Sequence, residues 1–317
     1  MSDVEPTLAE NEIGPISRAP EPFIDLRDNT GLASDQRLSP PVDGLKRRRL
    51  FGLDFIDSTS LDSVLSSLLR RQRSADESLM ETVLTPNVDI MVQLSRPEAA
   101  QSVEWRMFRH SQYCLPDGQP IVLASRFLGR TLGARLTGSG LFALLWPRLV
   151  SERRAVFIVA SSELIVRRLM KEYSELRSTI APMFDADDIA TTEELADSVI
   201  TAALETPLEY VILGIGYPKD ARIAEAILRL WPSSLGRPPA IMGLGAAASM
   251  HVGLTRRAPC WVQRIGMEWF YRFVQEPRRL FYRYFVRDVG YIKLVWRQWL
   301  ENRRTGSISV GEEVPST

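Results

Sequence analysis

The sequence predicts an α/β protein with a Rossmann-like, mostly parallel sheet and an appended C-terminal segment that is helical, basic and aromatic. Short, continuously apolar runs alternate with segments of helical periodicity, which is typical of strands covered on both faces and joined by crossover helices. Near the C-terminal end this alternation gives way to aromatic and basic residues at helical intervals. With 317 residues and 45% apolar composition, the chain can bury a large core.

The chain begins with a segment that is rich in Pro, Asp, Glu and Ser and poor in large apolar residues. Such a segment cannot bury enough surface to offset the entropy of ordering, so we expect a disordered tail over residues 1–45. A basic run follows, which predicts either a solvated charged surface or a contact with anionic lipid. This run consists of Lys46, Arg47, Arg48 and Arg49. We expect the α/β core at residues 46–260.

Strands are predicted where apolar residues follow one another or alternate. The candidates are residues 50–57, 81–84, 120–125, 155–161 and 209–216.

Helices are predicted where apolar residues recur at intervals of three and four. These segments are residues 60–72, 98–112, 163–173, 192–204 and 221–230. Thr191 and Glu194 have the spacing of a capping box at the start of one of them.

Residues 261–304 are expected to form amphipathic helices. Between residues 256 and 304 the chain has twelve basic residues against four acidic ones. Two interpretations remain open: an ordinary helix packed on the core, or an interfacial helix with its basic flank toward anionic lipid. Residues 305–317 are expected to be a flexible tail.

Composition excludes several classes of protein. Basic and acidic residues balance at 39 each, so overall charge gives no case for a nucleic-acid partner. Two cysteines, Cys114 and Cys260, do not suggest a disulfide-stapled secreted domain. We see no signal peptide and no apolar run of about 20 residues. The sequence therefore predicts a cytoplasmic protein with peripheral membrane contact.

Four turns are predicted at the ends of strands, where ligands bind in open parallel sheets. They are residues 85–87, 116–118, 214–219 and 243–248. Glycines in the last turn let a ligand approach the backbone closely, and the arginines and aromatic residues that follow suit a phosphorylated molecule at a bilayer surface.

These turns resemble motifs of the WecG/TagA/CpsF glycosyltransferases (glycosyltransferase family 26). Thr85-Pro86-Asn87 is similar to the family's TPN turn, and Pro116-Asp117-Gly118 to its PDG turn. Residues 211–219 are similar to its apolar strand ending in Gly-x-Pro-Lys. The order GLG, RAP-W, EW-YR, EP-R and RY follows within residues 243–284. The resemblance covers residues 50–287.

The resemblance implies an inverting glycosyltransferase that moves a sugar from a UDP-sugar to a polyprenyl-diphosphate-linked glycan. The transfer reaction would take place on the inner face of the cell membrane, in surface or exopolysaccharide biosynthesis, without metal or other cofactor. Whether copies of the chain form a homo-oligomer is left open. An alternative is a catalytically degenerate member that serves as a membrane-associated partner in polysaccharide assembly.

Asp117 is the candidate base, which takes the proton of the acceptor hydroxyl, with Thr85 and Asn87 orienting the acceptor or the base. From the residues alone, Asp-Gly is equally typical of a plain turn. The leaving diphosphate requires cations or backbone N–H groups. The predicted substrate-binding set is Gly118, Gly214, Gly216, Lys219, Gly243, Gly245, Arg257, Glu268, Arg272, Arg278 and Arg279.

Asp185 and Asp187 imitate an Asp-x-Asp metal site. Acidic residues are equally favourable just before a helix, and the pair matches no motif of the family, so we expect no metal there.

Several positions depart from the family's pattern in its presumed donor pocket. They are Asp220, Ala221, Ser249 and Gly140. The donor is therefore left open between a hexose and an N-acetylmannosamine type.

Overall fold

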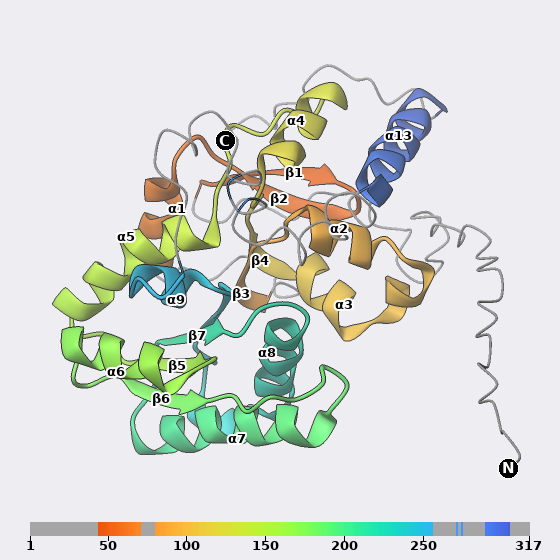
Figure 1. Ribbon diagram of the computed structural model, residues 1–317. Helices are drawn as coiled ribbons and strands as arrows, with labels where there is room; N and C mark the ends of the chain where they lie inside the picture. The colour runs from red at the N-terminus through yellow and green to blue at the C-terminus, as the bar shows by residue number, and fades with distance from the viewer. Residues whose placement is uncertain (1–43, 71–79, 256–270, 272–273, 275–288, 305–317) are drawn as a thin grey trace, which may run out of the picture.

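The computed structural model describes residues 44–70, 80–255, 271, 274 and 289–304 (Figure 1). These residues contain one eight-stranded sheet, in the order β1-β2-β4-β3-β8-β7-β5-β6. Only the edge pair β1–β2 is antiparallel, and every other neighbouring pair is parallel. The predicted Rossmann-like α/β fold is therefore confirmed. The expected N-terminal tail and residues 305–317 lie outside the described residues.

The strands are short, and β4, β5, β7 and β8 are buried at every residue. Their bounds are Lys46–Leu50 (β1), Leu53–Asp57 (β2), Met80–Leu84 (β3), Ser111–Cys114 (β4), Val156–Ala160 (β5), Arg177–Ile180 (β6), Tyr210–Gly214 (β7) and Ala240–Gly243 (β8).

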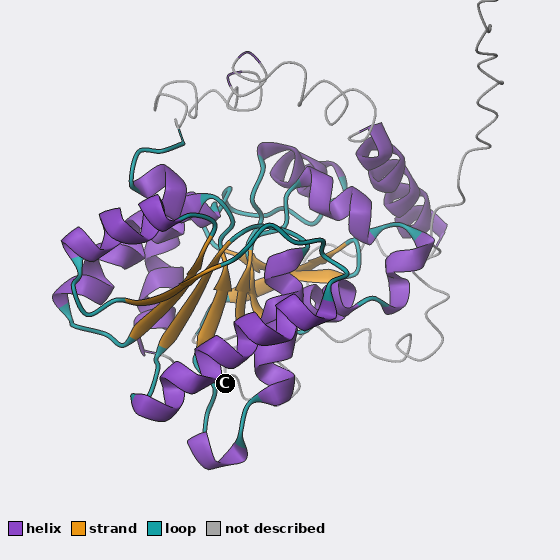
Figure 2. Cartoon of the chain, turned by 60° about the horizontal axis from the view of Figure 1, so that its bottom comes forward, coloured by secondary structure: helices purple, strands orange, loops and turns teal. Residues whose placement is uncertain are grey.

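Helices lie on both sides of the sheet, as Figure 2 shows. The helices between residues 61 and 127 are Leu61–Arg70 (α1), Val88–Leu94 (α2), Pro97–Gln101 (η1), Val103–Arg109 (α3) and Gln119–Phe127 (α4). The later ones are Gly138–Ser151 (α5), Glu163–Glu172 (α6), Ile189–Glu205 (α7), Lys219–Leu230 (α8), Ser233–Leu235 (η2), Ala247–His251 (α9) and Val289–Arg304 (α13).

Two apolar clusters fill the space between the sheet and its two helical layers. Strand β5 shows the principle: Val156 and Ile158 join the cluster with α1, α5, α6 and α9, whereas Phe157 and Val159 join the cluster with α3, α4, α7 and α8. Since successive side chains of a strand point to opposite faces, a strand between two helical layers must be apolar at every position.

Residues 120–125 form part of helix α4, so the strand predicted there is wrong. Ile121 and Ala124 face the core, while Leu123 lies on the outer side of the helix and is 53% exposed. Pro120 occupies the first turn, where its missing N–H leaves no helical hydrogen bond unmade. The run imitates a buried strand because the exposed side of this helix is also apolar.

The basic run at the start of the core is strand β1, and the predicted solvated charged surface is wrong for Arg47. Contact of this run with anionic lipid stays a prediction. Arg47 is buried and donates to the carbonyl of Gln112 at 2.5 Å. Arg48 and Arg49 form ion pairs across the hairpin, with Asp57 at 3.0 Å and Asp54 at 2.8 Å. These partners lie on β2 and β4, and a local charge pattern cannot reveal them.

Two helix starts differ from the predictions. Helix α7 begins earlier, because the carboxylate of Asp188 accepts from the backbone N–H of Thr191 at 3.1 Å; the capping box at Thr191 is therefore wrong. The helix predicted over residues 98–112 is interrupted at Ser102, whose hydroxyl caps α3 by accepting from Trp105 N at 3.1 Å.

The C-terminal prediction of a helix is confirmed for α13, whose Tyr291 and Leu294 are buried in the core. Among the described helices, none combines the length and the apolar character needed to span a bilayer.

Candidate active site

The four predicted turns meet at one edge of the sheet. They follow strands β3, β4, β7 and β8, and the sheet order β4-β3-β8-β7 makes these strands consecutive neighbours. Because the strands are parallel, their carboxyl ends lie at the same edge. We call this region the catalytic edge.

Asp117 is held by backbone groups from two other segments. Its own N–H donates to the carbonyl of Pro86 at 3.1 Å, which joins the turns after β4 and β3. Its Oδ2 accepts from the N–H of Gly138 at 3.3 Å, at the first position of the 14-residue helix α5. The N-terminal end of a helix is a favourable partner for a carboxylate because its N–H groups point outward.

Thr85 lies beside the same helix start. A Cβ added to Gly138 would be 3.2 Å from Thr85 Oγ1, so a side chain there would require the two segments to move apart by a few tenths of an ångström. The Thr85 hydroxyl donates to the carbonyl of Gly243 at 3.5 Å. Gly138 and Gly243 thus connect Asp117, Thr85 and the glycine turn after β8.

Asn87 has a structural function at this edge. Its Oδ1 accepts from the N–H of Ile90 at 3.1 Å and so caps helix α2. This cap does not use the side-chain amide nitrogen Nδ2, which is the group that Asn87 can offer to an acceptor substrate. Gly118 is likewise a helix-start residue, at the N-cap of α4.

The predicted glycines of the donor side pack directly on one another. Gly216 and Gly245 have φ of +86° and +53°, a region that side chains disfavour. A Cβ on Gly245 would lie 3.8 Å from the Cα of Gly216, and a Cβ on Gly214 would lie 3.3 Å from a β5 carbonyl. A Cβ on Gly243 would be 2.9 Å from Leu84 and 3.0 Å from Asp220. Close packing therefore favours glycine at Gly243 and Gly214, and the positive φ favours it at Gly216 and Gly245, before any ligand is considered.

Lys219 is the first residue of α8, and its ammonium lies 4.4 Å from the ring centroid of Phe184. This cation–π contact holds it between the turns after β7 and β6. The remaining predicted residues (Arg257, Glu268, Arg272, Arg278 and Arg279) lie outside the described residues.

Asp220 is a buried carboxyl group that the sequence marked only as a departure from the family's pattern. It is 6% exposed, lies against Gly243, and its Oδ1 accepts from the N–H of Ala221 at 2.8 Å. Burial raises the pKa of the Asp220 carboxyl to about 6. Nothing local to the sequence distinguishes it from an ordinary acidic residue in the first turn of a helix.

The site predicted from the sequence also did not include the start of helix α5. Thr137 caps this helix by accepting from the N–H of Gly140 at 3.0 Å, which orients the N–H of Gly138 toward Asp117. A Thr-Gly pair before an apolar run was the available signal. Of the other departures, Ala221 is buried, and the Ser249 hydroxyl lies 2.7 Å from that of Thr255.

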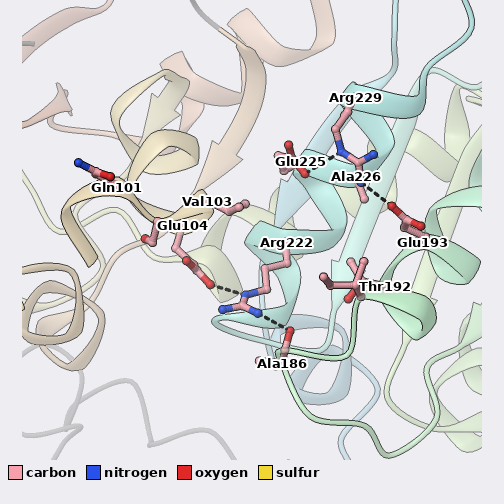
Figure 3. Close-up of a pocket in the computed structure, with 12 residues that line it drawn as sticks. Gln101, Val103, Glu104, Ala186, Thr192, Glu193, Arg222, Glu225, Ala226 and Arg229 are labelled. Carbon is pink, nitrogen blue, oxygen red and sulfur yellow. Dashed lines mark hydrogen bonds and ion pairs between the residues drawn. The ribbon is translucent and has the colours of Figure 1, made fainter. Parts of the chain in front are cut away.

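A concave region lies over helices α3, α7 and α8, away from the four turns (Figure 3). We call this groove of about 480 Å³ the charged groove. Arg222 pairs there with Glu104 and, at 2.6 Å, with Asp187; Arg229 pairs with Glu193 at 2.8 Å. Its arginines are thus engaged by carboxylates of the chain itself. Asp187, half of the Asp-x-Asp pair, is one of these carboxylates.

Comparison with known proteins agrees with the motifs at the catalytic edge. The sequence model of the family described as "Glycosyl transferase WecG/TagA/CpsF family" matches residues 48–305. The chain belongs to the WecG/TagA/CpsF family. It is therefore a glycosyltransferase, and the matched range extends through α13.

Two relatives are each named N-acetylglucosaminyldiphosphoundecaprenol N-acetyl-beta-D-mannosaminyltransferase. The chain is 27% identical to the one from Bacillus spizizenii strain W23 over 232 residues, which is 72% of this chain and 82% of the relative. It is 25% identical to the one from Bacillus subtilis strain 168 over 169 residues, 53% of this chain and 63% of the relative.

Proposed function

We propose that this protein is an inverting glycosyltransferase that moves a hexose or N-acetylmannosamine-type sugar from a UDP-sugar to a polyprenyl-diphosphate-linked glycan. The observation that carries the proposal is the Asp117 carboxylate, held at 3.3 Å by the N–H of Gly138 and connected to Thr85 through the same glycine. The names of the two relatives support a lipid-diphosphate acceptor. We further propose that the product enters surface or exopolysaccharide assembly.

In this mechanism Asp117 accepts the proton of the acceptor hydroxyl as that oxygen attacks the anomeric carbon and the bond to the UDP oxygen breaks. Attack from the side opposite the leaving group inverts the anomeric centre. Thr85 and the Asn87 amide orient the acceptor. Backbone N–H groups of the turn after β8, together with Lys219, Arg257, Arg272, Arg278 and Arg279, stabilise the departing diphosphate.

We propose that the reaction takes place at the inner face of the cell membrane, with residues 261–304 as the association segment. The acceptor's lipid is in the bilayer, and α13 ends in basic residues that suit an anionic surface.

The direct test is a screen of UDP-sugars against short-chain polyprenyl-diphosphate-linked sugars, with product identified by mass and anomeric configuration by NMR. We expect transfer from one donor class with inverted configuration. Retained configuration, or no transfer from any donor, contradicts the proposal. The second result would favour a degenerate member that acts as a partner protein.

A further inference from the structure

Helices α4 and α13 lie side by side, although they are far apart in the sequence. Near the start of both, the hydroxyl of Tyr291 donates to the carbonyl of Pro120 at 3.4 Å. Near the end of both, the amide of Asn302 donates to the carbonyl of Leu128 at 3.4 Å. The two helices therefore run in the same direction, at the same end of the molecule (Figure 1).

The two helices leave a continuous apolar face uncovered by the described residues. On α4, Leu123 and Phe127 are 53% and 56% exposed, and their spacing of four places them on one side of the helix. On α13 the exposed residues, also spaced by four, are Ile292 (68%), Trp296 (54%) and Leu300 (38%). We call these five residues the α4–α13 surface.

Trp299 connects the two halves of this surface. Its ring stacks on Phe127 with centroids 6.2 Å apart and on Trp296 with centroids 4.7 Å apart. An aromatic ladder thus crosses from α4 to α13. Large exposed aromatic residues beside aliphatic ones are typical of surfaces that enter a membrane interface.

Helices α4 and α13 carry more basic than acidic residues, and one of the basic residues, Arg297, pairs with Glu301 at 3.5 Å. Helices α4 and α13 contain one acidic residue, Glu301. Their basic residues are Arg126, Lys293, Arg297, Arg303 and Arg304. The guanidinium of Arg303 lies 4.0 Å from the ring centroid of Trp299, at the end of the ladder. A second copy of this chain would bring the same positive set face to face with itself, whereas an anionic bilayer is complementary to it.

We infer that the α4–α13 surface docks on an anionic bilayer, with α4 entering the interface together with α13. Helix α4 begins directly after Asp117 and Gly118 and has nine residues, a length of about 13 Å. Docking therefore places the bilayer within about that distance of the candidate base, measured along the helix axis. This last step rests on the proposed lipid-linked acceptor; the docking itself does not.

Flotation of the full chain with vesicles of phosphatidylcholine containing phosphatidylglycerol tests the inference. Leu123→Gln combined with Phe127→Gln should lower the partition coefficient about tenfold, because two apolar groups leave the interface. Trp296→Gln should give a similar loss. Arg303→Gln should lower binding about fivefold at low salt and less at high salt. Leu204→Gln, at a 63% exposed leucine on α7, is the matched control and should bind like the unaltered protein.

Turnover of a water-soluble acceptor analogue reports folding of each variant and separates this inference from the proposed function. Unaltered turnover with weakened flotation supports the docking surface. Flotation of the Leu123/Phe127 variant equal to that of the unaltered protein overturns the role of α4. Failure of the unaltered protein to float overturns docking, even where transfer to the analogue succeeds. A change in oligomeric state in place of vesicle binding also overturns it. If the variants float less than the unaltered protein but the unaltered protein transfers no sugar, the result supports docking and contradicts only the proposed function.

Discussion

The catalytic edge and the charged groove both hold carboxylates, but the contacts described for these carboxylates differ in kind. In the groove, Glu104 and Asp187 are paired with Arg222. At the edge, Asp117 accepts from the backbone N–H of Gly138. A carboxylate paired with arginine is committed to stability, because a ligand must replace that partner. At the edge, the backbone N–H at the start of helix α5 orients the carboxylate of Asp117. Concavity and charge density point to the charged groove, whereas the family motifs point to the catalytic edge.

Replacement of Asp117 by Asn should have the largest effect on turnover. The side-chain volume is nearly unchanged, but the base is removed, and such losses reduce rates by about 10²–10⁴-fold. The measurement is kcat with the best UDP-sugar, alongside circular dichroism to establish folding. A variant that keeps more than about a third of the turnover would remove Asp117 from the mechanism.

Glu104→Gln should affect stability rather than turnover. Glu104 is 5% exposed, and loss of its charge leaves Arg222 with Asp187 and the carbonyl of Ala186. We expect a loss of about 1–3 kcal/mol in the free energy of unfolding by urea titration.

Its control is Glu193→Gln in the same groove. The exposed pair of Glu193 with Arg229 should contribute about 0–1 kcal/mol. Loss of turnover in folded Glu104→Gln protein would mean that the groove takes part in the reaction.

Asp220 lies between the two regions, and its effect should depend on pH. The folded state raises the pKa of this carboxyl from 3.8 to about 6, so ionisation destabilises the fold. The contribution of the neutral Asp220 carboxyl to the free energy of unfolding is fully present below about pH 4 and is lost as pH rises through about 6. Asp220→Asn should therefore be more stable than the unaltered protein at pH 8, by up to about 3 kcal/mol, and no more stable at pH 4.

Thermal unfolding at several pH values measures this difference. Asp188→Asn provides the opposite sign, since the hydrogen bond from Thr191 lowers the pKa of Asp188; this variant should lose stability relative to the unaltered protein as pH rises. Equal melting temperatures of Asp220→Asn and unaltered protein at pH 8 would refute the buried-carboxyl account.

Gly138→Ala should reduce turnover about tenfold. The added Cβ meets Thr85 at 3.2–3.3 Å, so the start of α5 and its N–H to Asp117 must shift by a few tenths of an ångström. Ser139→Ala, the next residue of the same helix, is the control and should retain full turnover. Unchanged kcat in Gly138→Ala would show that this contact does not set the geometry of Asp117.

Chelation should have the smallest effect. If cations of the protein and backbone N–H groups stabilise the diphosphate, EDTA leaves turnover unchanged. A strict requirement for magnesium or manganese that disappears in Asp185→Ala would give the Asp-x-Asp pair a metal after all.

The sequence alone determined the fold class, because strands buried on both faces must be apolar at each position, as β5 and β7 are. It also predicted that four turns lie together, since parallel strands bring their carboxyl ends to one edge. The glycine turns and Asp117 needed no structure to be singled out.

Only the tertiary structure decided what each polar side chain meets. The N–H of Gly138 reaches Asp117, Asp220 lies against Gly243, and Arg47 donates to Gln112, in each case across a gap in the sequence. The same holds for α4, whose outer apolar face made it resemble a strand until its neighbours were known. Local patterns report periodicity and propensity, whereas burial and pairing depend on groups that the chain brings together only when it folds.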